Sequence, residues 1–255
     1  KIRRYGFHGI SHKYVSRRAA EFMGQDYRRV KTIVCHLGNG ASICAVKYGQ
    51  VVDNSMGFTP LEGLVMGTRC GDVDAGALEY LAKKENLDFQ QIMTILNQES
   101  GVLGISSNFS SDFRELKDAE IKYHEKAALA REIFAYKVAK YVGSYAAAMN
   151  GVDNIVFTAG IGENDSDIRE EICSYLERKI GVSYDPMQET MVTVGGSEAI
   201  DVALRCMLDP GDEVLIPQPS YVSYLPCTIM ADGVPVIIPL QYENEFKLTV
   251  EDLKK

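Results

Sequence analysis

The feature of this chain that most constrains its fold is the stretch Phe157-Thr158-Ala159-Gly160-Ile161-Gly162-Glu163-Asn164. A run of apolar and β-branched residues from Ile155 to Thr158 ends at two glycines, and a helical pattern begins at Asp165 or Ser166. A strand that leads through a glycine turn into a helix lets backbone N–H groups approach a nucleotide, and the helix dipole favours an anion there. Many α/β proteins turn with two glycines for structural reasons alone. The stretch therefore indicates an α/β fold and leaves both interpretations of the glycines open.

The composition is that of a globular protein without a membrane segment. The 255 residues can form one large domain or two small ones. No run of about 18 apolar residues occurs, so we expect no membrane span. The start, Lys1-Ile2-Arg3-Arg4-Tyr5, lacks the apolar stretch of a signal peptide and reads like the interior of a longer protein. The six cysteines show no C-x-x-C spacing, which favours reduced thiols and a cytoplasmic location over a disulfide framework.

Charge and proline are distributed unevenly along the chain. Residues 1–182 hold 23 Lys+Arg and 23 Asp+Glu, whereas residues 183–255 hold 4 and 12 and carry the whole net charge of −8. Pro60 is the single proline before residue 183, and seven of the eight prolines follow it. Such a break predicts two segments of different origin. No basic patch of the kind that nucleic-acid binding requires is evident.

The periodicity of the first segment predicts alternating strands and helices. We expect strands over residues 31–37, 41–47, 50–54 and 155–158, and helices over residues 13–23, 76–85, 89–99, 124–149 and about 166–179. The first three strands form a meander, with a hairpin turn of the Asn-Gly kind at Gly38-Asn39-Gly40. Residues 100–114 are expected to form a loop, and Asn150-Gly151 to cap the long helix.

Three polar features of this segment have both a structural and a functional interpretation. The turn at Gly38-Asn39-Gly40 offers free N–H groups to a phosphate. Arg69, set between small residues, is either a surface ion-pair partner or a guanidinium that clamps a phosphoryl group. His8 and His12 are four residues apart, and we expect them to be hydrogen-bonded loop and helix-start histidines. A zinc pair is disfavoured because the glutamate of H-E-x-x-H is absent.

Five motifs taken together resemble the acetate kinase family. They are Arg4–His12, His36–Gly40, Met56–Asp74, Ser111–Arg114 and Phe157–Asn164, in that order over residues 1 to about 180. The resemblance implies an α/β fold, the ribonuclease-H-like domain of the acetate and sugar kinase/actin-like ATPase superfamily. Residues 1–180 would be most of the second, nucleotide-binding domain of such a kinase. The reaction implied is transfer of a phosphoryl group from ATP, with Mg²⁺, to acetate or a short carboxylate.

The resemblance also assigns roles to residues. The residues implied to hold ATP are His36, Leu37, Gly38, Asn39, Gly40, Asp112, Phe113, Arg114, Gly160, Ile161, Gly162, Glu163 and Asn164. His8 and Arg69 would be catalytic and would stabilise the charge on the phosphoryl group in flight. The family's first domain, with its catalytic aspartate, and the C-terminal glutamate that helps to bind Mg²⁺ have no counterpart here. We therefore expect no metal ligand in this chain and little or no activity from the chain alone.

The second segment resembles the large domain of a class I pyridoxal-phosphate aminotransferase. A strand at 191–194, a turn at Gly195–Glu198, a helix at 199–208 and a strand at 213–216 carry the resemblance. It implies that Gly196, Ser197 and Glu198 hold the cofactor phosphate and that Tyr221 stacks on the pyridine ring. The Schiff-base lysine has no counterpart, so pyridoxal phosphate would have only a remnant site.

Two segments with these resemblances predict a chimeric reading frame, with residues 1–180 kinase-like and residues 181–255 a partial α/β aminotransferase fragment. The favoured function is that of an acetate kinase-like phosphotransferase. The alternatives are an aminotransferase-related fragment and a non-catalytic nucleotide-binding module. We expect small-molecule substrates and a possible homodimer, and no nucleic-acid or membrane partner.

Overall fold

A computed structural model describes residues 2–180, 204, 207–220, 223–242 and 248–249 of the chain. The chain divides into two compact units, Lys1–Thr193 and Val194–Lys255. The change of origin expected near residue 181 stays a prediction.

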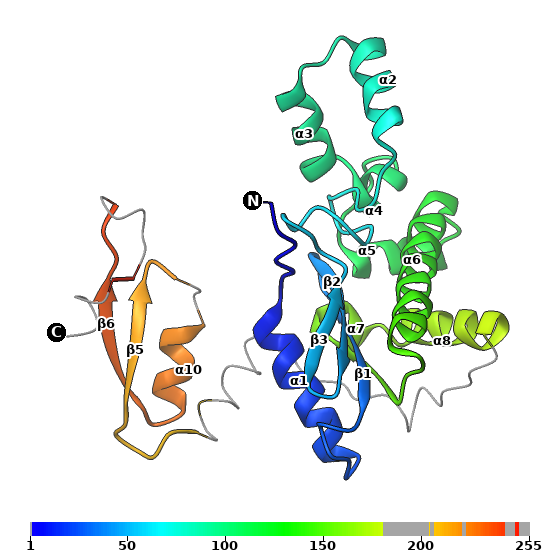
Figure 1. Cartoon of the computed structure of the whole chain (residues 1–255). Coiled ribbons are helices and arrows are strands. Elements are labelled where there is room, and N and C mark those ends of the chain that lie inside the picture. The colour runs from blue at the N-terminus through cyan, green and yellow to red at the C-terminus, as the bar shows by residue number, and fades with distance from the viewer. Residues whose placement is uncertain (1, 181–203, 205–206, 221–222, 243–247, 250–255) are drawn as a thin grey trace. The chain divides into compact units, whose positions relative to one another are not determined.

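A four-stranded sheet forms the centre of the first unit (Figure 1). Its order is β3-β2-β1-β4, where β1 is Lys31–Leu37, β2 is Ala41–Lys47, β3 is Gln50–Asn54 and β4 is Asn154–Thr158. The first three strands have the predicted bounds, and β4 begins one residue earlier than predicted. The meander is not a separate sheet, because β4 pairs with β1 in parallel. A parallel pair needs a long crossover, which here contains five helices.

The two faces of β1 pack against different helices. Ile33, Cys35 and Leu37 belong to the main core, together with residues of α6 (Glu125–Met149). Val34 points to the opposite face and packs with Val15 and Ala19 of α1 (Gly9–Phe22). Since successive side chains of a strand alternate, the next even-numbered residue of β1, His36, lies on the α1 side.

The other helices are α2 (Ala75–Glu85), α3 (Phe89–Gln98), α4 (Gly101–Ile105), α5 (Phe113–Ile121), α7 (Ala159–Asn164) and α8 (Ser166–Ile180). The predicted C-cap of α6 is confirmed, because Asn150 is left-handed at φ 57°. The expected loop over residues 100–114 is wrong in part. Backbone N–H groups of Val102 and Leu103 donate to Met66 and Gly67, so tertiary contacts hold α4 in a segment without helical periodicity.

The glycine-containing segment Phe157–Asn164 is also more helical than predicted. Ala159 turns the chain directly after β4 with a left-handed φ of 66°, and α7 begins there instead of an open glycine loop. The side chain of Asn164 donates to the carbonyl of Gly160, and Arg169 of α8 donates to the carbonyls of Gly162 and Glu163. These hydrogen bonds provide donors for carbonyl groups of α7, which is too short to pair them all within the helix.

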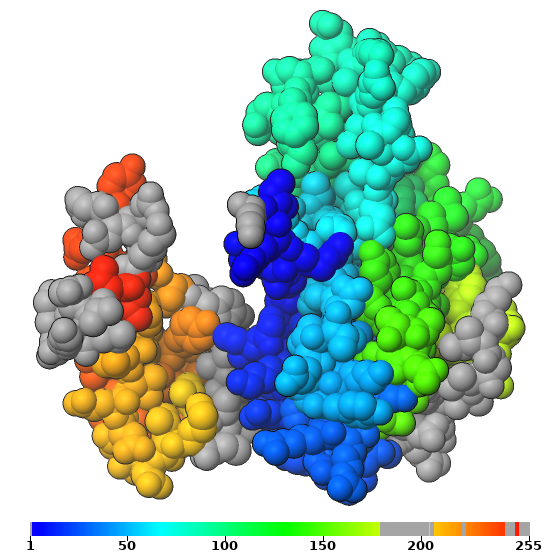
Figure 2. Space-filling model, viewed as in Figure 1, coloured from blue at the N-terminus to red at the C-terminus, as the bar shows by residue number. Residues whose placement is uncertain are grey.

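Helices α2 and α3 form an arm that stands apart from the sheet. None of the residues of α2 is buried. Asp88 caps α3 in a capping box with Gln91, which fixes the turn between the two helices. Figures 1 and 2 show the arm projecting beyond the rest of its unit.

The described part of the second unit is a β–α–β element. Strands β5 (Glu213–Gln218) and β6 (Val234–Pro239) pair in parallel, and α10 (Tyr224–Met230) connects them. The predicted strand at 213–216 is confirmed and extends by two residues. The strand at 191–194, the turn residues Gly196, Ser197 and Glu198, and Tyr221 lie outside the described residues.

Two expectations from composition can be compared with the described residues. None of their helices combines the length and the apolar character that crossing a membrane would need. Cys35, Cys44, Cys70, Cys173 and Cys227 are free thiols.

Candidate functional site

The turn between β1 and β2 is held against the glycine-rich segment that follows Pro60. The N–H of Gly67 donates to the carbonyl of Asn39 at 3.0 Å. A Cβ placed on Gly67 would lie 1.6 Å from Oδ1 of Asn39, so a residue with a side chain at this position would force the Asn39 side chain to move. Glycine at this position leaves room for that side chain.

Arg69 lies beside the same turn. Its Nη1 is 3.3 Å from the position that a Cβ on Gly40 would take, and 3.9 Å from the sulfur of Met66. Among the described residues, no carboxylate forms an ion pair with Arg69. The described residues therefore give no support to the interpretation of Arg69 as a surface ion-pair partner. Its guanidinium N–H groups are placed to donate to an anion.

Three histidines meet on the α1 side of the sheet. The rings of His8 and His36 are stacked with centroids 4.0 Å apart and planes 18° apart. His8 precedes α1 in the left-handed region at φ 59°, an unusual backbone for a side-chain-bearing residue. The ring of His12 lies edge-on to both others. His8 and His12 are hydrogen-bonded, as expected, and both bonds go to Ser42.

Burial disfavours the charged form of all three imidazoles. Burial lowers the pKa of His36 to about 3, with a further contribution from His8. Burial also lowers the pKa of His12 well below the ordinary histidine value. The pKa of His8 is lowered by burial first and by the positive charge of Arg69 second. A neutral imidazole is a donor on one ring nitrogen and an acceptor on the other, so the cluster offers hydrogen bonds without further positive charge.

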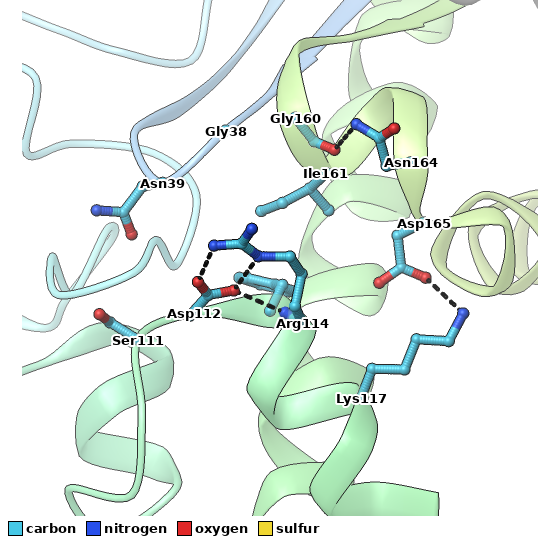
Figure 3. Close-up of a pocket in the computed structure, with 11 residues that line it drawn as sticks. Gly38, Asn39, Ser111, Asp112, Arg114, Lys117, Gly160, Ile161, Asn164 and Asp165 are labelled. Atoms are coloured by element: carbon cyan, nitrogen blue, oxygen red, sulfur yellow. Dashed lines mark hydrogen bonds and ion pairs between the residues drawn. The ribbon is translucent and has the colours of Figure 1, made fainter.

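A cavity of about 780 Å³ opens between the β1–β2 turn, the start of α5 and the helix α7 (Figure 3). It is lined by Gly38, Asn39, Ser111, Asp112, Phe113, Arg114, Lys117, Gly160, Ile161, Asn164 and Asp165. This volume is within the range of small-molecule sites. The cavity therefore gathers segments that are more than 100 residues apart in the sequence.

The start of α5 presents one charged pair to the cavity. The carboxylate of Asp112 accepts from the backbone N–H of Arg114 at 2.8 Å and from its guanidinium at 2.6 Å. These bonds from Arg114 lower the pKa of Asp112. Because the side chain of Arg114 is almost fully exposed, it can leave this pair to contact a ligand.

Three lining residues, Ser111, Lys117 and Asp165, were not among the predicted site residues. Lys117 lies 2.8 Å from Asp167 and 3.9 Å from Asp165. Asp165 is buried and accepts from Arg131 of α6 at 2.5 Å. Helical spacing could have found Lys117, since residues three apart on α5 share a face with Arg114. No sequence pattern links Asp165 to Arg131.

The predicted site residues are distributed over two adjoining groups. Gly38, Asn39, Asp112, Phe113, Arg114, Gly160, Ile161 and Asn164 line the cavity, whereas His8, His36, Gly40 and Arg69 lie around the β1–β2 turn. Leu37, Gly162 and Glu163 do not line the cavity. The side chain of Leu37 is fully buried in the core, and Glu163 is also buried. The described residues contain no cluster of three His, Cys, Asp or Glu side chains that could hold a metal ion.

Comparison with known proteins gives a consistent result for most of the chain. The model of the acetokinase family matches residues 1–213. Acetate kinase from Helicobacter hepaticus is 55% identical over 221 residues, and that from Thermotoga maritima 53% over 220; in each case 85% of this chain is covered. The crystal structure of Porphyromonas gingivalis acetate kinase superposes with a TM-score of 0.73 and 45% identity over 78% of this chain. A propionate kinase from Francisella tularensis gives 0.71 and 42% over the same share.

The chain spans about half the length of the curated relatives it matches. The alignments cover 54% of each of the two acetate kinases, and the structural superpositions cover 54% of each solved chain.

Proposed function

The chain belongs to the acetokinase family, and from that premise we propose that its site binds ATP and takes part in phosphoryl transfer to acetate or a short carboxylate. The observation that carries the proposal is the guanidinium of Arg69 beside the β1–β2 turn, which forms no ion pair with any described residue and lies near a cavity of about 780 Å³. In the reaction, a carboxylate oxygen attacks the γ-phosphorus and the bond to the β–γ bridging oxygen breaks, which yields an acyl phosphate and ADP.

The groups around the turn suit this chemistry. Phosphoryl transfer places negative charge on three equatorial oxygens and needs in-line positioning rather than covalent help from the protein. Arg69 supplies a fixed positive charge, and His8 supplies a neutral N–H donor. Neither group must give up a proton during the step. The backbone N–H groups at Gly38–Gly40 would hold the phosphates of ATP.

The cavity would hold the rest of the nucleotide. Asp112, Arg114 and Lys117 are polar groups at its α5 side, and Gly160 and Ile161 bring the backbone of α7 to its opposite wall. The lining thus combines apolar surface with a few polar groups, the usual composition of a site that fixes a ligand's orientation. Mg²⁺ would arrive with the nucleotide and neutralise charge on its phosphates.

We also propose that this chain alone binds nucleotide more readily than it catalyses transfer, since it spans about half of its relatives. A homodimer and a cytoplasmic location belong to the same proposal. The support for both is the family membership of residues 1–213.

Calorimetric titration of the chain with ATP·Mg²⁺ tests the nucleotide site. We expect saturable heat and an upward shift of the thermal transition. The variant Arg69→Gln should keep most of the affinity of the chain for ATP·Mg²⁺. In a complete enzyme that contains this site, the same variant should lower the rate of acetyl phosphate formation by about 10²–10³-fold, as for loss of one transition-state donor.

Arg29→Gln is the matched control for that test. It removes one positive charge from an arginine that is paired with Asp26 at the surface, so it should leave both quantities unchanged. Absence of heat and of any thermal shift with the unmodified chain would refute the nucleotide site. Equal losses of affinity and rate in Arg69→Gln would refute the role of Arg69.

For the residues from about 183 onward we propose a different origin, as a fragment of an aminotransferase-like large domain. The support is the excess of acidic residues and prolines there, together with the β–α–β element of residues 213–239. Since the family match continues to residue 213, sequencing of the genomic locus across codons 170–220 is the direct test. Without a Schiff-base lysine the segment should give no yellow chromophore with pyridoxal phosphate. Appearance of an aldimine absorption band would contradict the prediction that no lysine of this segment forms a Schiff base with pyridoxal phosphate.

A further inference from the structure

A single hydroxyl, that of Ser42, lies between two histidine rings. Its Oγ is 2.9 Å from Nδ1 of His8 and 2.7 Å from Nε2 of His12. Ser42 is fully buried on β2, directly opposite His36 of β1. A hydroxyl has one proton and can donate it to one of the two rings only. The other ring must therefore donate to the serine oxygen.

The other ring nitrogen of His12, Nδ1, shows which of the two histidines donates to the oxygen of Ser42. Nδ1 of His12 is buried and has no hydrogen-bond partner among the described residues. If Ser42 donated to His12, the proton of the neutral His12 ring would sit on this Nδ1 as a buried N–H without an acceptor. Buried N–H groups without an acceptor are rarer than buried acceptors without a donor. The proton of His12 therefore belongs on Nε2.

From this geometry we propose that Ser42 and His12 are positioning residues that fix the tautomer of His8. Nε2–H of His12 donates to the oxygen of Ser42, and the hydroxyl of Ser42 donates to Nδ1 of His8. The single proton of the neutral His8 ring is then held on Nε2. The assignment of this tautomer is independent of the reaction, and its consequence for catalysis rests on the proposed function.

The consequence concerns which atom His8 offers to the phosphoryl group. With the proton on Nε2, the nitrogen of His8 that Ser42 does not occupy is a hydrogen-bond donor. In the other tautomer the same nitrogen would present a lone pair, which repels a phosphoryl oxygen. The stacked ring of His36 and the left-handed backbone at His8 keep the ring in this orientation. Ser42 would thus contribute to transfer without contacting either substrate.

The tautomer can be read directly by nuclear magnetic resonance of the full chain labelled with ¹⁵N-histidine, at a pH where the rings are neutral. Two-bond ¹H–¹⁵N correlations separate Nδ1–H from Nε2–H rings. The chain has four histidines, which keeps the spectrum simple. His124 is an internal reference, because its Nδ1 accepts from the backbone N–H of Ala127 and its neutral ring must carry the proton on Nε2.

We expect the Nε2–H pattern for His8 and His12 in the unmodified chain. In Ser42→Ala the His8 ring should lose the fixed pattern, and its nitrogen shifts should move toward the average of two tautomers. Ser11→Ala is the matched control. It removes a serine bond of 2.9 Å to His36 in the same cluster and should leave the pattern of His8 unchanged.

A proton on Nδ1 of His8 in the unmodified chain would overturn the proposal, and this measurement needs no variant to fold. An unchanged Nε2–H pattern in a folded Ser42→Ala protein would overturn it as well; the His124 signals report whether that protein is folded. His12→Gln, which retains an N–H donor toward Ser42, should preserve the His8 pattern. Because none of these readouts involves ATP, they separate failure of this inference from failure of the proposed function.

Discussion

The buried ion pair between Arg131 and Asp165 allows a quantitative test of how α6 and α8 are joined. The guanidinium and the carboxylate are 2.5 Å apart, with side chains 4% and 9% exposed. Removing one partner of a buried pair leaves an uncompensated charge and costs about 3–5 kcal/mol. Glu120 also contacts Arg131 in this structure and would continue to compensate its charge. We therefore expect Asp165→Asn to lower the free energy of unfolding by about 3 kcal/mol, the low end of that range.

Asp167→Asn is the matched control, two residues away in the same helix start. Its side chain is 58% exposed and pairs with Lys117, a pair of the kind that contributes about 0.5 kcal/mol. The assay is urea unfolding followed by circular dichroism. At a slope of about 2–3 kcal/mol per molar urea, the loss in Asp165→Asn corresponds to a midpoint shift of roughly 1 M.

Equal, small shifts in the two variants would refute the reasoning, because they would mean that burial does not distinguish the two carboxylates. Arg131→Met combined with Asp165→Leu should recover much of the loss, since replacing a whole buried pair by apolar groups is often neutral. A double variant as unstable as Asp165→Asn would show that hydrogen bonds rather than charge compensation hold α6 to α8.

Two further predictions concern the turn and the histidines. Gly67→Ala would place its Cβ 1.6 Å from the side-chain oxygen of Asn39 and force this side chain at the cavity to move, so it should weaken ATP binding in calorimetry. Gly143→Ala, with no atom within 4 Å of the new Cβ, should instead raise the free energy of unfolding by about 0.5–1 kcal/mol. Burial depresses the pKa of His36 to about 3 and that of His12 well below 6.5. Between about pH 3 and pH 6.5 the unfolded chain therefore binds more protons than the folded chain. The contribution of these histidines to the free energy of unfolding should therefore be fully present above pH 6.5 and be lost as the pH falls below 6.5. Urea titrations at pH 7.5, 6.5 and 5.5 measure this change. Equal unfolding midpoints at the three pH values would contradict the burial of these rings.

The individual strands were predictable because their signals are local. The alternation of residues 31–37, the Asn-Gly turn and the alternation of residues 41–54 each specify one strand or turn without help from the rest of the chain. The ends of α6 were readable for the same reason, since Asn150 forms a local cap. The bounds of these elements differ from the predicted ones by one residue or less.

Two of the elements that were not predicted, α4 and α7, are held by hydrogen bonds with residues outside the helix. Helix α4 is held by carbonyls of Met66 and Gly67, some 35 residues earlier in the chain. Helix α7 is tied by Arg169 and by a left-handed Ala159, a residue type with no preference for that region. Propensity cannot indicate such segments, because tertiary hydrogen bonds rather than local preference stabilise them.

The candidate site divides in the same way. Its glycines and Arg69 were visible as motifs, because close approach and anion binding each require particular residue types. Asp165, Ser42 and Lys117 were not singled out, since a buried aspartate, a strand serine and a helix lysine occur in any α/β protein. Only the geometry shows that Asp165 and Lys117 border the cavity and that Ser42 joins two rings.

Strand β1 aligns the two groups of site residues with each other, because it pairs with both β2 and β4. His36 stands level with Ser42 on one neighbouring strand and with Thr158, the last residue before α7, on the other. An insertion of one residue within β1 would turn His36 away from α1 and misalign both neighbours at once. Helix α2, which has no buried residue, has no such double alignment, so changes in length should be tolerated best there and least in the seven residues of β1.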